Sequence, residues 1–218
     1  LLGDQHGTVV PFVERECSIQ RRHQKVVEES PSPAMTPAIR HAMMSAAAAV
    51  ARGVGYTNAG TIEFLLDEDG KFYFLEMNTR LQVEHPITEM VTGIDIVRQQ
   101  LRIAAGENLE TTGRASRRGH AIEVRLNAED PARGFAPSPG VVERFKPPLG
   151  PGVRLDTHIE AGAVIPPYYD SLVAKLIVWD ETRPLAIERS LHALSELELR
   201  GIATTRDVAA EILASDEF

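Results

Sequence analysis

Two short apolar runs on either side of Asp69-Gly70 constrain this chain more than any other feature. Residues 61–66 and 71–77 are rich in β-branched, aromatic and aliphatic side chains, which is the composition of strands. Asp-Gly between two such runs is typical of a two-residue type I′ turn. With that turn, counting back along both strands places Glu63 directly opposite Glu76. Like charges in that position repel, so we expect a positive group between them.

A magnesium site is one explanation for the opposed glutamates. Directly opposed side chains have Cβ atoms about 4.5–5.5 Å apart, and Asn78 adds an amide oxygen on the same strand face. Two carboxylates and an amide are hard oxygen ligands that suit Mg²⁺. A solvent-facing hairpin edge is the plainer interpretation, because exposed charges interact weakly in water. The residues after the hairpin help to distinguish the two.

Polar residues continue at every second position beyond the second strand. Asn78, Arg80, Gln82 and Glu84 alternate with less polar neighbours. If the segment stays extended, all four lie on one face, and Pro86 ends it. A planar guanidinium that binds anions in a bidentate manner, next to an amide and a carboxylate, suits a small oxyanion such as bicarbonate.

The rest of the chain mixes helices with short strands, which indicates an α+β fold. Helices are predicted from Thr36-Pro37 to Arg52, from about Ile94 to Ala105, from Thr182-Arg183-Pro184 towards Gly201, and from Thr204 or Thr205 onward. Strands are predicted at 8–13, 120–126, 141–145, 153–158 and 172–178, after a hairpin at 4–7. The polar segment 14–25 is expected to be a loop or an edge. A further polar segment, 107–118, is the expected boundary between two subregions.

Charge and cysteine content exclude several classes of function. The 218 residues carry 23 Lys and Arg against 31 Asp and Glu, a net charge of −8, so neither nucleic acid nor an anionic membrane is an expected partner. Cys17 is the only cysteine, which favours a reducing cytoplasm. The longest apolar run, Ala46–Ala51, is far shorter than the roughly 20 residues of a membrane span. Leu1 is not Met, so we expect the sequence to begin inside a domain.

Four stretches of the chain resemble biotin carboxylases, which are ATP-grasp enzymes. They are Glu76-Met77-Asn78-Thr79-Arg80-Leu81-Gln82-Val83-Glu84-His85-Pro86, the run 15–29, the run 119–131 and the run 166–172. The resemblance covers nearly the whole chain in order. It implies the C-terminal half of an ATP-grasp fold (antiparallel sheet with helices) over residues 1–112, and a biotin carboxylase C-terminal domain over residues 113–218.

The resemblance implies ATP-dependent carboxylation of biotin by bicarbonate through carboxyphosphate. Mg²⁺ or Mn²⁺ would be held by Glu63, Glu76 and Asn78. ATP would contact these two glutamates and Gln20, His23, Leu65 and Leu75. Bicarbonate and biotin would be bound by Lys25, Arg80, Gln82, Val83 and Arg125. Glu84 would act as the base, and Arg80, Arg125 and Lys25 as the other catalytic residues.

Plainer interpretations of single residues stay open on sequence grounds. The run 21–25 is by itself more typical of a solvated loop. Arg125 could pair with Glu123 or Glu129 on an exposed strand face. Tyr168 and Tyr169 suit packing or an interface better than catalysis. Cys17 is expected to be an unreactive thiol.

The resemblance also implies partners and leaves two other functions open. It implies a homodimer, a biotin carboxyl carrier domain and a carboxyltransferase, with fatty acid biosynthesis as one setting. The final carboxyl acceptor, whether acetyl-CoA, another acyl-CoA or pyruvate, is determined outside this sequence. The N-terminal domain and the ATP lid of the family have no counterpart in the sequence, so the chain is expected to be inactive alone. A folded module for dimerisation or assembly, without turnover, is the alternative. Another ATP-grasp carboxylate–amine ligase is the third possibility.

Overall fold

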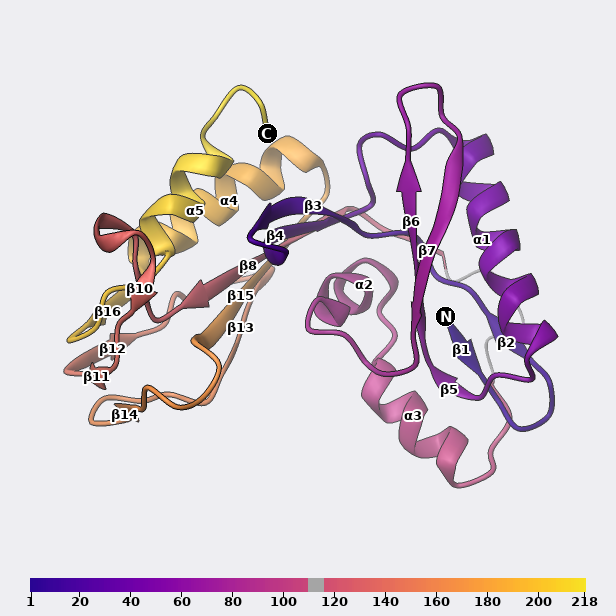
Figure 1. Ribbon diagram of the computed structural model, residues 1–218, viewed down its shortest axis with the longest axis horizontal. Helices are drawn as coiled ribbons and strands as arrows, with labels where there is room; N and C mark the ends of the chain where they lie inside the picture. The colour runs from indigo at the N-terminus through magenta and orange to yellow at the C-terminus, as the bar shows by residue number, and fades with distance from the viewer. Residues whose placement is uncertain (110–115) are drawn as a thin grey trace. The chain divides into compact units, whose positions relative to one another are not determined.

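The computed structural model describes residues 1–109 and 116–218, which form two compact units (Figure 1). Unit 1 comprises residues 1–16 and 30–118, and unit 2 comprises residues 17–29 and 119–218. The boundary expected between residues 112 and 113 lies outside the described residues. No helix in the described part of the chain is long and apolar enough to cross a membrane.

Unit 1 contains a three-stranded antiparallel sheet with a helix on each face. Its strands, in spatial order, are β2 (Val9–Val10), β1 (Leu2–Gly3) and β5 (Asn58–Ala59). Successive strand residues point to opposite faces, so Val9 packs against α1 (Pro37–Gly53). Val10 and Leu2 pack with the buried side chains of α3 (Ile96–Ala104). The hairpin expected at residues 4–7 is confirmed, because it joins β1 to β2.

Helix α1 begins where its local sequence predicts. The Thr36 side chain accepts a hydrogen bond from the backbone N–H of Ile39 at 3.2 Å, and Pro37 occupies the first turn, where its missing N–H costs nothing. The other end differs slightly from the expectation. Gly53 is the last helical residue, and Val54 is the cap.

The hairpin formed by β6 (Thr61–Leu66) and β7 (Phe72–Asn78) corrects the predicted turn. Leu66 pairs with Phe72, and the Gly70 N–H donates to the Asp67 carbonyl at 3.1 Å. Gly70 has a φ of 77°, so the loop has a longer form that needs a left-handed residue, and the expected two-residue turn is wrong.

A β-bulge at Leu75 restores the predicted register further along the hairpin. Phe64 pairs with Phe74, whereas Glu63 pairs with Glu76, so Leu75 is the extra residue on β7. The opposition of Glu63 and Glu76 is therefore confirmed, although the turn that was used to predict it is different.

The segment after β7 is not extended, contrary to the prediction. Strand β7 ends at Asn78, and α2 (His85–Thr92) begins after a turn in which the His85 N–H donates to the Gln82 carbonyl at 3.3 Å. Pro86 lies in the first turn of α2, a position that suits its fixed φ. The proline therefore starts a helix rather than ending a strand, and the four polar residues do not share one strand face.

Unit 2 is built on a five-stranded sheet in the order β13–β15–β8–β4–β3. The strands are β13 (Val153–Thr157), β15 (Leu172–Asp180), β8 (His120–Asn127), β4 (Gln24–Ser30) and β3 (Glu16–Arg21). Strand β3 lies at the edge of the sheet, which confirms an edge within the polar segment 14–25. The sequence did not indicate that β4, which pairs with β3, also pairs with β8 about a hundred residues later.

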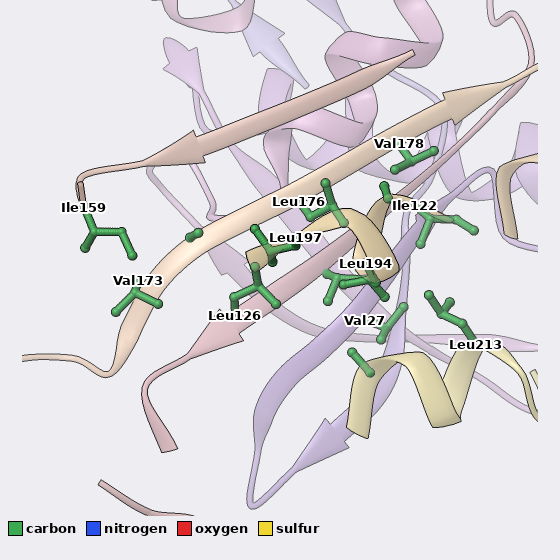
Figure 2. Packing of buried hydrophobic residues seen from close by; sticks show 14 of the residues in the cluster. Val27, Ile122, Leu126, Ile159, Val173, Leu176, Val178, Leu194, Leu197 and Leu213 are labelled. Carbon is green, nitrogen blue, oxygen red and sulfur yellow. The ribbon is translucent and has the colours of Figure 1, made fainter. Parts of the chain in front are cut away.

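The core of unit 2 lies between this sheet and two helices. Helices α4 (Arg183–Glu196) and α5 (Arg206–Leu213) contact β8, and α4 also contacts β15. Leu194 and Leu213 from the helices pack with Val27 from β4 and Leu126 from β8 (Figure 2). Val27 shows that the early hairpin is part of this core.

Short strands complete unit 2 and differ from the prediction in two places. The single strand expected at 141–145 is two strands, β11 (Gly140–Val141) and β12 (Arg144–Lys146), which pair with β14 (Val164–Ile165) and β16 (Glu198–Arg200). The helix expected to run towards Gly201 ends at Glu196, because β16 follows it. Strands β9 (Glu129–Asp130) and β10 (Ala136–Pro137) flank a 3₁₀ turn, Pro131–Arg133.

Candidate functional site

Two opposed glutamates on the β6–β7 hairpin form the centre of a polar cluster in unit 1. Glu63 pairs in register with Glu76. The Asn78 amide nitrogen donates to Oε1 of Glu76 at 2.8 Å and to Oε1 of Glu63 at 3.3 Å. These N–H donors offset part of the repulsion between the carboxylates. They occupy the position where sequence reasoning expected positive charge.

Arg80 fixes the orientation of the Asn78 amide. Its Nη2 donates to Asn78 Oδ1 at 3.1 Å, and its Nη1 donates to the Leu81 carbonyl at 3.2 Å. A guanidinium can only donate hydrogen bonds, so the amide oxygen must face Arg80 and the amide nitrogen must face the glutamates. The exposed cation is thereby tied to the carboxylate pair through one amide.

Gln82 makes a second link to the same carboxylates. Its Nε2 donates to Glu63 Oε1 at 2.7 Å, and its Oε1 accepts from Arg15 Nη2 at 2.5 Å. Gln82 is 6% exposed, so its amide is held away from bulk water. We call Glu63, Glu76, Asn78, Arg80 and Gln82 the hairpin cluster.

Glu84 follows the hairpin cluster in sequence and is buried. It is 2% exposed and immediately precedes α2. His85 contacts the Gln82 carbonyl through Nδ1 at 2.8 Å, which helps to hold this turn. Val83 lies between the two buried polar residues and is half-buried.

The donor set of the hairpin cluster fits Mg²⁺ bound together with a phosphate ligand. Within the described residues, no group of three or more His, Cys, Asp or Glu side chains is placed to hold a metal ion. The protein therefore offers two opposed carboxylates, whereas the Asn78 amide oxygen, the third predicted ligand, faces Arg80. Mg²⁺ is commonly held by one or two carboxylates, with phosphate and water oxygens completing six positions, so the cluster matches that mode.

Unit 2 carries the second group of predicted residues. Arg125 on β8 donates from Nε to Oε1 of Glu28 on β4 at 2.6 Å, and its Nη2 also pairs with this oxygen. The Glu28 side chain is fully buried, so the alternative in which Arg125 lies on an exposed strand face does not hold. Lys25 lies on β4, the strand next to β8, and is half-buried.

The nucleotide-contact candidates lie on both hairpins. In unit 2, Gln20 is exposed and donates to the Cys17 carbonyl at 2.9 Å, and His23 is exposed at the turn between β3 and β4. In unit 1, Leu65 and Leu75 are 57% and 52% exposed. Large apolar side chains at such exposure are candidates for ligand contact.

The run 21–25 is an ordered hairpin and not a solvated loop. The Arg21 guanidinium pairs with Glu129 and lies 4.1 Å from the centre of the Phe135 ring. Arg22 and His23 have φ values of 50° and 65°, the left-handed conformation of a tight hairpin turn. The hairpin therefore presents His23 and Lys25 from a fixed backbone.

Sequence reasoning missed two residues that hold the predicted ones. Arg15 binds Gln82, and Glu28 binds Arg125. A signal for Glu28 existed in the adjacent acidic residues Glu28 and Glu29 within an apolar strand, because buried carboxylates need cationic partners. Arg15 carried no comparable local signal.

Comparison with known proteins gives first the class and then the family. Residues 1–112 match the family described as "Carbamoyl-phosphate synthase L chain, ATP binding domain", and residues 123–218 match "Biotin carboxylase C-terminal domain". The two matched regions follow each other along the chain. The chain belongs to the biotin carboxylase family.

Individual relatives match along the whole chain. A biotin carboxylase of Nostoc sp. is 52% identical over 219 residues, covering 100% of this chain and 49% of the relative. The biotin carboxylase of Haemophilus influenzae is 50% identical, with 100% and 48% covered. The biotin carboxylase domain dimer of the Hydrogenobacter thermophilus 2-oxoglutarate carboxylase, solved with MgADP, ADP and bicarbonate, has a TM-score of 0.97 and 50% identity, with 100% and 48% covered. The chain spans about half the length of these relatives.

Proposed function

We propose that this chain supplies the bicarbonate-activating and carboxyl-transferring residues of a biotin carboxylase. The observation that carries the proposal is the hairpin cluster, in which the anion-binding Arg80 is tied through Asn78 to the opposed Glu63 and Glu76. A related structure contains MgADP and bicarbonate, the two ligand types that such a cluster fits. Residues 1–112 and 113–218 are proposed as the ATP-grasp part and the C-terminal domain.

The proposed first step is the formation of carboxyphosphate. Glu63 and Glu76 would hold Mg²⁺, and Asn78 would join them if its amide oxygen turned from Arg80 to the metal. The bound ion would offset charge on the phosphates during transfer. Arg80, Gln82 and the Val83 backbone N–H would orient bicarbonate, and Glu84 would remove its proton. The freed oxygen attacks the γ-phosphorus, a P–O bond forms, and the bond to ADP breaks. Lys25 would stabilise the transferred phosphoryl group, while Gln20, His23, Leu65 and Leu75 would contact the nucleotide.

The proposed second step transfers the carboxyl group to biotin. Carboxyphosphate splits into CO₂ and phosphate, and the phosphate accepts the N1 proton of biotin. Arg125 would stabilise the enolate-like oxygen of the deprotonated ureido ring, and N1 then attacks CO₂ to give carboxybiotin. The biotin is proposed to sit on a carrier domain, a carboxyltransferase would use the product, and the protein would act as a cytoplasmic homodimer.

The test is ADP formation that depends on both biotin and bicarbonate. ADP formation is measured for two proteins. One is a polypeptide of the relatives' length that contains this chain, which we call the full-length polypeptide, and the other is the 218-residue chain. Activity of the full-length polypeptide alone supports the proposal. Bicarbonate-independent ADP formation by both would contradict it and favour a different ATP-dependent ligase, whereas no activity in either would favour an assembly module.

A further inference from the structure

Arg15 ties three separate parts of unit 1 together. Its Nη2 donates to Gln82 Oε1 at 2.5 Å and to Thr61 Oγ1 at 2.9 Å, and its Nη1 donates to Thr88 Oγ1 at 3.0 Å. Thr61 begins β6, Gln82 lies in the turn after β7, and Thr88 lies in α2. Thr88 and Gln82 are 1% and 6% exposed, so two of these bonds end on buried groups.

The bond to Gln82 decides which way the glutamine amide points. The two ends of a side-chain amide have almost the same shape, so only hydrogen bonding selects one orientation. Arg15 can only donate, so Oε1 turns to Arg15 and the –NH₂ group turns to Glu63, which accepts at 2.7 Å. An amide has two N–H groups, and Glu63 is the described acceptor of one of them.

Reversal of the amide would be unfavourable for an anion next to the hairpin cluster. A reversed Gln82 would point its oxygen at the Glu63 carboxylate and would have no N–H to offer on that side. Oε1 of Gln82 carries a partial negative charge and the carboxylate a full one, so their close approach is repulsive. Arg15 prevents this reversal by occupying the amide oxygen.

Resting on the proposed function, we infer that Arg15 is a positioning residue for bicarbonate. It acts through Gln82 by holding the amide N–H groups on the substrate side, and its bonds to Thr61 and Thr88 hold the guanidinium itself in place. Loss of the arginine is therefore expected to weaken bicarbonate binding about tenfold or more, where a factor of ten corresponds to about 1.4 kcal/mol.

The experiment compares Arg15→Met with a matched arginine variant in the full-length polypeptide. Arg40 is the control, because its Nε and Nη2 donate to Glu14 at 2.7 Å each within the same unit, and it has no described bond to the hairpin cluster. We expect Arg15→Met to raise the KM for bicarbonate about tenfold while the KM for ATP stays near the wild-type value. Arg40→Met should leave both KM values unchanged. An equal rise in both KM values for Arg15→Met would overturn the inference.

A double-mutant cycle tests whether Arg15 acts through Gln82. Gln82→Ala alone should raise the KM for bicarbonate, and adding Arg15→Met to Gln82→Ala should produce little further rise, since the amide to be oriented is gone. If the fold-changes of the two single variants in the KM for bicarbonate simply multiplied in the double variant, Arg15 would act on the anion independently of Gln82. That outcome would overturn the inference.

Thermal unfolding will show whether Arg15→Met folds. If it does not, Arg15→Lys is the second variant that tests the inference. Lysine retains the charge, but a single ammonium group cannot reproduce the fork that reaches Gln82 and both threonines, so an intermediate KM for bicarbonate is expected. A wild-type KM for Arg15→Lys would attribute the effect to charge alone and overturn the positioning role. A wild-type polypeptide without bicarbonate-dependent ADP formation would instead overturn the proposed function, and the inference with it.

Discussion

The carboxylate of Glu28 accepts hydrogen bonds from two nitrogens of the Arg125 guanidinium, and the Glu28 side chain is fully buried. The pair joins neighbouring strands β4 and β8. A buried carboxylate in contact with one edge of a guanidinium fixes its plane, because the fork geometry is rigid. The direction in which Arg125 faces a substrate therefore depends on Glu28.

We predict that Glu28→Gln lowers kcat for biotin-dependent ADP formation by about tenfold or more, since the neutral amide aligns the guanidinium less firmly. The KM for bicarbonate should change little, because Arg125 is proposed to act on biotin. Steady-state kinetics of the full-length polypeptide provide the measurement. Glu198→Gln, which alters a partly exposed ion pair with Arg144 in the same unit, is the control. A change confined to the bicarbonate KM would contradict this assignment.

Glu84→Gln tests the proposed base. The amide cannot accept the bicarbonate proton, so bicarbonate-dependent turnover should fall by about 10²–10⁴-fold, the usual contribution of general base catalysis. MgATP affinity, measured by calorimetric titration, should stay near the wild-type value. Turnover within a factor of two or three of wild type would remove Glu84 from the role of base.

Glu76→Gln tests the metal role of the opposed glutamates. Removing one of the two carboxylates should raise the Mg²⁺ concentration needed for half-maximal activity about tenfold, because Mg²⁺ binds carboxylate oxygens far better than amide oxygens. A titration of activity against Mg²⁺ at fixed ATP measures the shift. Glu68→Gln, at an exposed position in the turn of the same hairpin, should leave the curve unchanged. Coincident curves for Glu76→Gln and wild type would rule out this ligand.

Asp4 is expected to make unit 1 sensitive to acid. Its burial would raise the pKa of the carboxyl group, but hydrogen bonds from the backbone N–H groups of Leu109, Thr8 and His6 outweigh burial and lower the pKa. A lowered pKa contributes stability that is present above the unfolded value of about 3.9 and is lost as the pH falls through the folded value.

Asp4→Asn should therefore lower the free energy of unfolding at pH 7 by about 1–2 kcal/mol. The difference between the variant and wild type should shrink as the pH falls below about 4. Urea unfolding of the 218-residue chain across this pH range measures both effects. A difference that stays constant with pH would show that the ionised carboxylate is not responsible.

Local signals were enough to predict the elements whose ends are capped by their own residues. Thr36 and Pro37 define the start of α1, and Thr182 accepts from the Leu185 N–H at 3.5 Å at the start of α4. The start of α2 carried the same kind of signal in Pro86. The alternating polar residues before Pro86 favour an extended segment, however, and this pattern obscures the start of the helix.

Elements stabilised by distant partners could not be predicted in the same way. The three residues of β16 pair with β12, and the sequence of so short a segment does not indicate which strand it pairs with. Likewise, Arg15 is recognised as part of the site only because Gln82, Thr61 and Thr88 converge on it. The residues of the hairpin cluster could be predicted from the local sequence. The side chains that orient them could not, because only the folded chain brings them close to the cluster.

The bulge at Leu75 divides the hairpin into two parts whose registers differ by one residue. Between the bulge and the turn, Leu65, Tyr73 and Phe74 are more than half exposed, so a shift of pairing there moves few buried groups. Beyond the bulge, Glu63 and Glu76 are held by Asn78 and by Gln82. Insertions or deletions in the turn can therefore accumulate during evolution while the two glutamates stay opposite each other.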